Sequence, residues 1–282
     1  MKTIYLSYYA AALFFWLADV LQKKGSENRS LWHYLSIRSI FTFSIATLFT
    51  LCLYGVGDFP HVVQLLAIAG CSLLCLGGLF FYLKAVHSTA FSNVGSLSII
   101  GIVFQQLMGY WLFNESLRMN DWLAFLLMSA GCVYQLFSTR LQKGAVWVLC
   151  CSACWVSGYS LMAYFLKNME VVWTISIMEG TILLVSTLIV FFSPITLRNT
   201  AARSLHFPTL IGVAILICLA SYFNNTAFKH IPLSTLSILQ LSMMPIGYVL
   251  SLRVFREKPG TIEWMSLVTG MIGFALFVFK PF

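Results

Sequence analysis

Charged side chains are scarce in this chain, and acidic side chains are the scarcest. Lys, Arg, Asp and Glu make up 9% of the 282 residues, with 17 basic and 9 acidic side chains, whereas hydrophobic residues make up 60%. A soluble domain carries about a quarter charged residues, so these few charges could not cover the surface of a water-soluble protein of this length. The composition predicts a polytopic membrane protein whose surroundings are the lipid bilayer.

Long polar segments are also missing. The longest predicted loop has about a dozen residues, which leaves no room for a soluble domain, an ATP-binding cassette or a glycine loop that cradles phosphates. We therefore do not expect energy from directly bound ATP. No basic cluster is interleaved with aromatics in a polar segment, so nucleic acid is not an expected partner, and the glycines form no cofactor motif, so no cofactor is expected.

Catalytic and metal-binding patterns are absent too. The five histidines lie in or beside predicted loops at no metal-like spacing, and neither GxSxG nor HExxH occurs. We therefore do not expect an enzyme, and an intramembrane enzyme is only a minor alternative. The eight cysteines lie in apolar segments, and Cys151-x-x-Cys154 has no second pair or nearby His, which favours packing roles over redox or zinc chemistry.

What the sequence does contain is a series of apolar segments of spanning length. A transmembrane helix needs roughly 20 mostly apolar residues. Lys23 and Lys24, rather than a cleavage site of small residues, follow the first segment, so we expect it to be a retained span. Ten segments are predicted: 3–21, 34–56, 62–83, 91–113, 121–139, 144–165, 172–193, 207–226, 233–252 and 262–279.

One stretch of the chain occurs twice. Residues 80–137 align without a gap on residues 222–279 at an offset of 142, although apolar segments can also resemble one another by chance. The shared order is Phe-x-Glu, then acid-Trp, then Gly, at Phe113/Phe255, Glu115/Glu257, Trp122/Trp264 and Gly131/Gly273. The repeat predicts an all-α fold of two halves, 1–141 and 142–282, each with five helices. Because five is odd, the second half enters the membrane with the opposite orientation, which gives inverted repeats around a shared site.

These motifs, with Phe113-Asn114-Glu115 and Phe255-Arg256-Glu257 at the ends of the fourth and ninth segments, resemble the EamA-type permeases of the drug/metabolite transporter superfamily over essentially the whole chain. The resemblance implies a ten-helix secondary transporter of small organic metabolites or amphipathic compounds, more often an exporter, in a bacterial-type cytoplasmic membrane. A non-transporting interaction or sensor subunit is the alternative. The substrate, the coupling ion (protons are one candidate) and the choice between monomer and homodimer stay open.

The orientation of the chain stays open as well. Eleven Lys and Arg residues follow odd-numbered segments and five lie on the opposite face. The positive-inside rule then places both termini outside, whereas members of the family that the chain resembles usually have cytoplasmic termini.

Two charged residues are predicted to lie within the hydrocarbon core, where inserting a charged side chain costs about 2.5–3.5 kcal/mol. Arg38 and Glu179 are each roughly 8–10 Å from the predicted start of their segments. They enter from opposite faces, so we do not expect a direct pair. We expect them to flank a central cavity, with Glu179 as proton acceptor or cation contact and Arg38 as anion contact. The alternatives are snorkelling of Arg38 to the headgroups and a structural hydrogen bond of Glu179.

Other acids are expected to be structural. Asp19 precedes Lys23 by four residues, which favours a helix-surface ion pair. Glu115 and Glu257 lie in loops, and Asp121 and Glu263 begin the next helices, where acids favour a helix N-terminus. Aromatic rings and amides complete the predicted site, because they suit apolar, cationic or polar substrate groups, although helix packing is their alternative role. The predicted substrate-binding residues are Trp16, Arg38, Tyr82, Trp155, Tyr159, Glu179, Tyr222 and Asn225.

Overall fold

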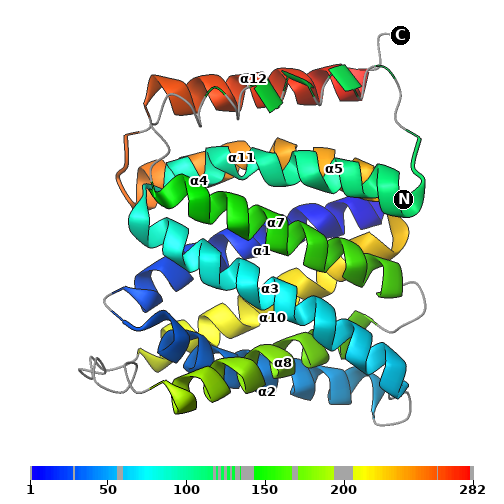
Figure 1. The fold of residues 1–282 in the computed structure, drawn as a ribbon, viewed down its shortest axis with the longest axis vertical. Helices are drawn as coiled ribbons and strands as arrows, with labels where there is room; N and C mark the ends of the chain where they lie inside the picture. Colours follow the sequence, from blue (N-terminus) through cyan, green and yellow to red (C-terminus); the bar gives the residue numbers. More distant parts are fainter. Residues whose placement is uncertain are drawn as a thin grey trace. The chain divides into compact units, whose positions relative to one another are not determined.

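Every element described in the computed structural model is an α-helix (Figure 1), which confirms the all-α prediction. The structure describes residues 2–27, 29–55, 60–116, 143–166, 171–193, 206–258 and 260–279, and a few single positions between 119 and 134. The predicted segment 121–139 falls largely outside these residues. The described helices are α1 Lys2–Ser26, α2 Leu31–Tyr54, α3 Val62–Ser88, α4 Phe91–Leu97, α5 Ile99–Phe113, α7 Lys143–Leu166, α8 Val171–Phe192, α10 Phe207–His230, α11 Leu233–Val254 and α12 Thr261–Phe279.

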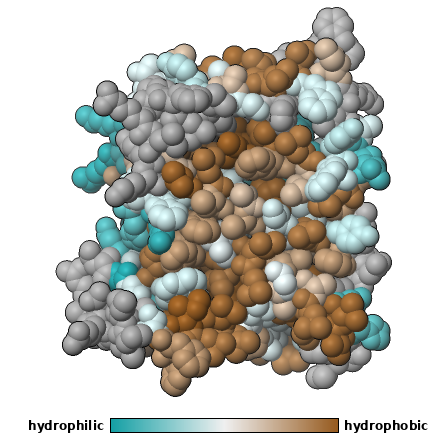
Figure 2. Space-filling model, viewed as in Figure 1, coloured by the Kyte–Doolittle hydropathy of each residue, from teal (hydrophilic) through white to brown (hydrophobic). Residues whose placement is uncertain are grey.

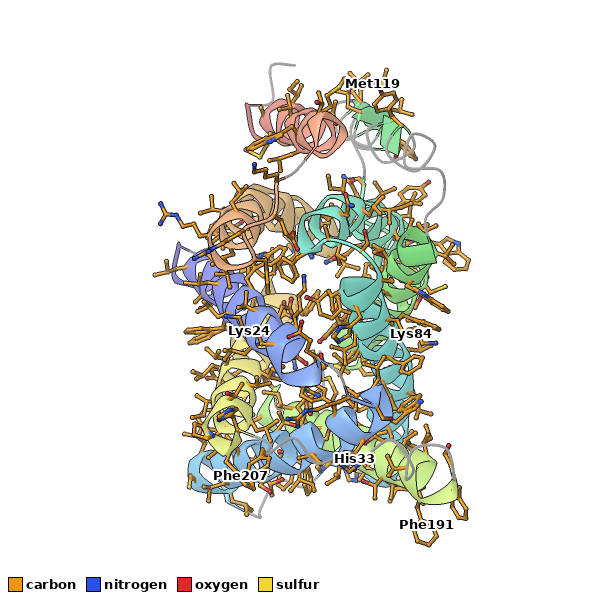
Figure 3. The ribbon with its side chains drawn as sticks, turned by 90° about the vertical axis from the view of Figure 1, so that its left-hand side faces the viewer. Lys24, His33, Lys84, Met119, Phe191 and Phe207 are labelled. Carbon is orange, nitrogen blue, oxygen red and sulfur yellow. The ribbon has the colours of Figure 1, made fainter. Side chains whose placement is uncertain are left out.

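Seven candidate membrane spans lie among the described residues, so the chain is a multi-pass membrane protein. They are Ile4–Ser26, Leu31–Leu53, Val62–Ser88, Asn93–Phe113, Gly144–Leu166, Val171–Phe192 and Phe207–His230. Their outward faces are apolar: Leu48 and Leu66 are more than 60% exposed, and apolar atoms cover much of the face shown in Figure 2. Phe191, at the end of α8, projects away from the neighbouring helices (Figure 3). Lipid tails, unlike water, accommodate such a surface.

The predicted fourth segment, 91–113, is divided into two helices at Ser98. The Ser98 hydroxyl donates a hydrogen bond to the Gly95 carbonyl (2.7 Å), and the Gly101 N–H donates to the Ser98 carbonyl (2.9 Å). The backbone bond spans three residues, as in a 3₁₀ turn, and a serine side chain that bonds back to its own helix tends to bend it. The segment is still one candidate span, Asn93–Phe113, with its α-helix interrupted at Ser98.

The helices group into two compact units that do not follow the two sequence halves. Unit 1 comprises residues 1–83 and 161–230, and unit 2 comprises residues 84–160 and 231–282. Each unit therefore combines helices from 1–141 with helices from 142–282. At the offset of 142, α2 corresponds to α8 and both belong to unit 1, whereas α4 corresponds to the start of α11 and both belong to unit 2.

In unit 1, α1 packs along α10, and α2 packs on α8 and also contacts α10 (Figure 1). Ala18 of α1 contacts Val213 and Ile217 of α10, and Ala46 of α2 packs with Ile175 of α8. Alanines at these contacts let the helix backbones approach, which is the usual basis of helix association in membranes.

In unit 2, α11 packs against α4, α5 and α12. The repeat is visible here in the backbone. Asn114 and Arg256, which are equivalent at the offset of 142, both have φ of 52°, and they are the non-glycine residues with positive φ in the described part of the chain. The Asn114 N–H and the Glu115 N–H (3.3 Å) both donate to the Gly109 carbonyl, and an Asn in the left-handed conformation is a common helix ending.

Candidate functional site in unit 1

A ladder of polar contacts joins α2 to α8. Small polar residues recur every three or four positions on one face of α2, and Ser39, Thr42 and Thr50 are fully buried there. Ser36 bonds Thr187 (2.9 Å) and Thr50 bonds Ser176 (2.7 Å) through their hydroxyls. Higher numbers on α2 pair with lower numbers on α8, so the two helices run antiparallel. An inverted repeat requires this orientation of two equivalent helices.

Arg38 and Glu179 form a buried ion pair within this ladder. Arg38 Nη2 lies 3.4 Å from Glu179 Oε1, and the side chains are 3% and 1% exposed. The Thr42 hydroxyl donates to Glu179 Oε2 (2.6 Å). Both carboxylate oxygens are therefore engaged by α2.

The expectation that Arg38 and Glu179 are not a direct pair is wrong. The helices begin earlier than predicted, at Leu31 and Val171, which moves the two charges to roughly 10 and 12 Å from the helix starts. These depths approach the middle of a hydrocarbon core of about 30 Å. The long Arg38 side chain spans the remaining difference in depth between the two residues, so neither charge has to reach the headgroups.

Arg38 retains hydrogen-bonding capacity beyond this pair. Its Nε and Nη1 are buried and have no hydrogen-bond partner among the described residues. The hydroxyls of Tyr34 and Ser39, on the same helix, are also buried and also have no hydrogen-bond partner there. A buried donor without a partner costs free energy. Oxygen atoms of a bound solute or of water would satisfy these groups.

Asp19 belongs to the same neighbourhood, and its ion pair with Lys23 stays a prediction. The Gln22 side-chain amide donates to Asp19 Oδ1 (3.3 Å). Asp19 also lies beside the predicted site residue Tyr82 and interacts electrostatically with Arg38. α1 continues to Ser26, beyond the predicted end at residue 21, so Asp19 lies inside the helix rather than at its end.

The α10 residues of the predicted site also lie in unit 1. Tyr222 packs edge-on against Phe49 (5.7 Å between ring centroids) and against Phe223 (5.5 Å). Asn225 is fully buried, and both polar atoms of its amide lack a hydrogen-bond partner among the described residues. Trp16, on α1, is half-buried.

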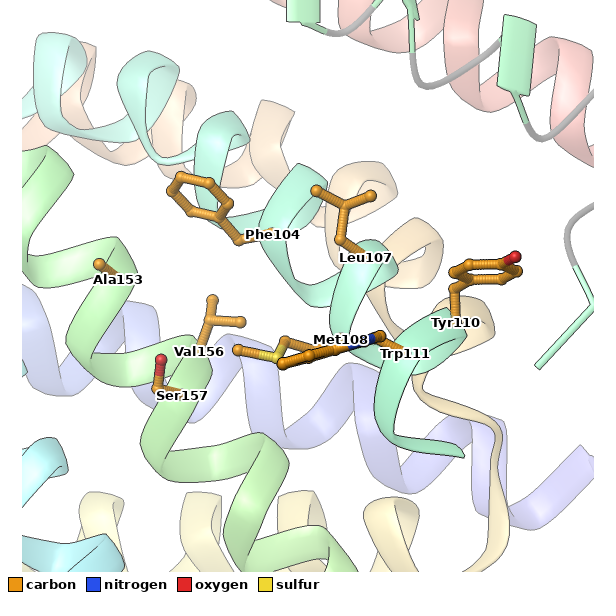
Figure 4. Close-up of a pocket in the computed structure, with 8 residues that line it drawn as sticks. All are labelled: Phe104, Leu107, Met108, Tyr110, Trp111, Ala153, Val156 and Ser157. Carbon is orange, nitrogen blue, oxygen red and sulfur yellow. The ribbon is translucent and has the colours of Figure 1, made fainter. Parts of the chain in front are cut away.

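Trp155 and Tyr159 lie on the part of α7 that belongs to unit 2, so they are described apart from the Arg38–Glu179 pair. Unit 2 contains an apolar pocket of ≈ 460 Å³ between α5 and α7 (Figure 4). Neither Trp155 nor Tyr159 is among its lining residues, which are Phe104, Leu107, Met108, Tyr110, Trp111, Ala153, Val156 and Ser157. None of these side chains is charged, so the pocket offers no ionic anchor for a solute.

Within the described ranges, no group of three or more His, Cys, Asp or Glu side chains is placed to hold a metal ion. The unit 1 site brings together one guanidinium, two carboxylates and the surrounding hydroxyls and amides.

Comparison with known proteins identifies the family. No match was found among curated proteins. A solved crystal structure with 18% sequence identity superimposes with a TM-score of 0.71 and covers 99% of this chain and 98% of its own, which shows a shared fold. The EamA-like transporter family model matches the chain twice, over residues 2–137 and 142–279. The chain therefore belongs to the EamA-like transporter family, within the drug/metabolite transporter superfamily.

Proposed function

We propose that this protein is a secondary active transporter that exports small organic metabolites or amphipathic compounds across the cytoplasmic membrane. Members of its family are membrane transporters rather than enzymes. The proposed mechanism is alternating access, in which two inverted repeats expose a central cavity to one side and then to the other. The observation that carries the proposal is the buried Arg38–Glu179 pair, with its unused donors, inside two membrane-spanning helices.

The energetics favour a functional role for this pair. Breaking a buried ion pair is costly, but replacing both charges by apolar residues is often neutral or stabilising. Charges at membrane depth are therefore characteristic of substrate and ion pathways. In this role, Arg38 Nε and Nη1 would donate to acceptor oxygens of the solute, while Glu179 would accept a proton or a cationic group.

The remaining predicted residues supply shape and polarity. Trp16, Tyr82 and Tyr222 would offer ring faces to apolar or cationic solutes, and the free amide of Asn225 would bind a polar group. Trp155 and Tyr159, on the part of α7 that belongs to unit 2, stay predicted substrate-binding residues. The antiparallel packing of α2 on α8 supports the inverted arrangement, because these two helices are equivalent in the repeats.

Three coupling modes are consistent with this site: proton-driven transport through Glu179, solute exchange and facilitated diffusion. Protonation of Glu179 would remove the negative charge that faces Arg38 and would weaken the bond from Thr42. Proton uptake would then release the guanidinium for the solute. This step gives Glu179 a coupling role that a purely structural carboxylate would not have.

The test begins with thermal stabilisation of the purified protein by amino acids, nucleosides, sugars and organic cations. Compounds that stabilise the protein are then tested for flux in proteoliposomes with wild type, Glu179→Gln and Ser44→Ala, since Ser44 is exposed on the same helix and bonds its own backbone. We expect wild type and Ser44→Ala to transport and folded Glu179→Gln to lose most flux. Equal flux and equal pH dependence in Glu179→Gln would reject the site, and no flux by wild type would favour the interaction-subunit alternative.

A further inference from the structure

The starts of α4 and α11 in unit 2 lack caps of their own. The first N–H groups of a helix have no partner within it, and a preceding Ser, Thr, Asp or Asn often supplies one. Here the preceding residues are Ala90 and Pro232, which are equivalent at the offset of 142 and carry no side-chain acceptor.

Two glutamates from distant loops accept these hydrogen bonds. The Leu233 N–H donates to Glu115 Oε1 (2.7 Å), and the Ser234 N–H donates to Glu115 Oε2 (2.8 Å). In return, the Phe91 N–H donates to Glu257 Oε1 (2.8 Å). Each glutamate therefore caps a helix of the other sequence repeat.

The exchange is reciprocal in sequence as well as in space. Phe91 and Leu233 are equivalent at the offset of 142, as are Glu115 and Glu257. Each glutamate follows a residue with φ of 52°, Asn114 or Arg256, and this left-handed backbone reverses the chain after its helix.

The surrounding packing leaves room for these bonds. A Cβ on Gly109 would lie 2.8 Å from Glu115 Oε2 and 3.1 Å from the Ser234 nitrogen, so the absent side chain makes space for the carboxylate. On the other side, the Phe255 and Phe91 rings pack with centroids 5.1 Å apart. All these residues belong to unit 2.

We propose that Glu115 and Glu257 form a reciprocal clasp that makes α4, α5 and α11 move as one body during the transport cycle. A carboxylate at a helix N-terminus gains from charge-assisted hydrogen bonds and from the helix dipole. Because every bond of the clasp crosses between repeats, removing one glutamate weakens a helix start that is distant in the sequence, 118 residues away for Glu115 and 166 for Glu257. The helix that carries the glutamate keeps its own start. The clasp is independent of the substrate site in unit 1.

Hydrogen–deuterium exchange of the full-length protein in nanodiscs tests this crossed dependence. We expect Glu115→Ala to raise the exchange rate of the peptide containing Leu233 and Ser234 at least tenfold and to leave that containing Phe91 unchanged. Glu257→Ala should give the converse. Glu27→Ala, at an exposed carboxylate after α1, is the matched control and should change neither peptide.

A milder pair of variants keeps the proposal testable if the alanine proteins do not fold. Glu115→Gln and Glu257→Gln retain an acceptor oxygen but lose the charge. We therefore expect a smaller increase in the exchange rate of the peptide that each glutamate caps in the other repeat. The proposal would be overturned if the exchange rate did not change in the peptide that the substituted glutamate caps, or if it rose only around the substituted loop.

A distance measurement tests the shared movement. Spin labels on noncanonical residues at Tyr110 of α5 and Val249 of α11, both about half exposed, avoid the native cysteines. We expect one narrow distance distribution in wild type and a broadened one in the Glu115→Ala/Glu257→Ala double variant. An unchanged distribution in the double variant would show that the clasp does not hold these helices together.

Discussion

At the scale of single residues, the two members of the buried ion pair are held very unequally. Glu179 has a partner at each oxygen, whereas Arg38 has one long contact and two nitrogens without a partner in the described chain. Because of this inequality, Arg38 is the group that gains most hydrogen bonds from a bound solute. The inequality also determines how substitutions of the pair should change the free energy of unfolding.

Replacing Arg38 alone should be far worse than replacing the pair. We expect Arg38→Leu to lower the free energy of unfolding by about 3 kcal/mol, because Glu179 is left buried without its positive partner. The Arg38→Leu/Glu179→Leu double variant should recover most of this loss. Reversible unfolding in mixed detergent measures both, and a double variant that costs the sum of the two single variants would contradict the prediction.

Thr42 should contribute through its bond to Glu179. We expect Thr42→Val, which removes the donor at nearly constant shape, to cost about 1 kcal/mol, in the range of interhelical hydrogen bonds in membrane proteins. The control is Ser44→Ala, whose hydroxyl bonds the Ile40 carbonyl of its own helix, and its effect should stay within about 0.5 kcal/mol. Equal effects of the two substitutions on the unfolding free energy would be the opposing result.

At the scale of helices, close approach of α2 and α8 underlies the site. A Cβ on Gly180 would lie 2.9 Å from the Phe43 ring, so the residue next to Glu179 has to be small. This contact sets the separation at which Arg38 and Thr42 reach the carboxylate.

Gly180→Ala should therefore loosen the site. We expect it to lower the thermal midpoint and to reduce flux, because Phe43 has to move. Gly70→Ala is the control: nothing lies within 4 Å of its Cβ, and alanine in a helix is favoured over glycine by about 0.5–1 kcal/mol. If Gly180→Ala were as stable and as active as wild type, the close contact would have no role.

Much of the helix layout could be predicted from hydropathy, since each described span follows an apolar run. The break at Ser98 could not, because it depends on one serine bonding back to its own helix. The Arg38–Glu179 pair was missed because the predicted helix starts were late, by three residues for α2 and by one for α8, so both charges were placed too near the membrane surface. The sequence repeat did identify Glu115 and Glu257, but not that each caps a helix of the other repeat.

At the scale of the whole molecule, sequence repeats and compact units divide the chain differently. The family model separates the chain near residue 140, whereas the compact units combine segments of both repeats. Hydropathy and sequence offset report local similarity, so they could not reveal which helices pack together. The predicted halves 1–141 and 142–282 stay a description of the sequence.

Ten spans, an even number, would place both termini on the same face of the membrane. We expect reporter fusions to the two termini, one active only in the cytoplasm and one only outside it, to give matching results at both ends. The same experiment decides between the outside location from the charge count and the cytoplasmic location usual in the family. Termini on opposite faces would contradict the ten-helix topology.

Solute counterflow in proteoliposomes tests alternating access most directly, with a compound that stabilises the purified protein. Vesicles loaded with unlabelled compound are diluted into a trace of labelled compound. A carrier whose site faces one side at a time should accumulate label transiently above its outside concentration. Label that only equilibrates, without an overshoot, would contradict the account.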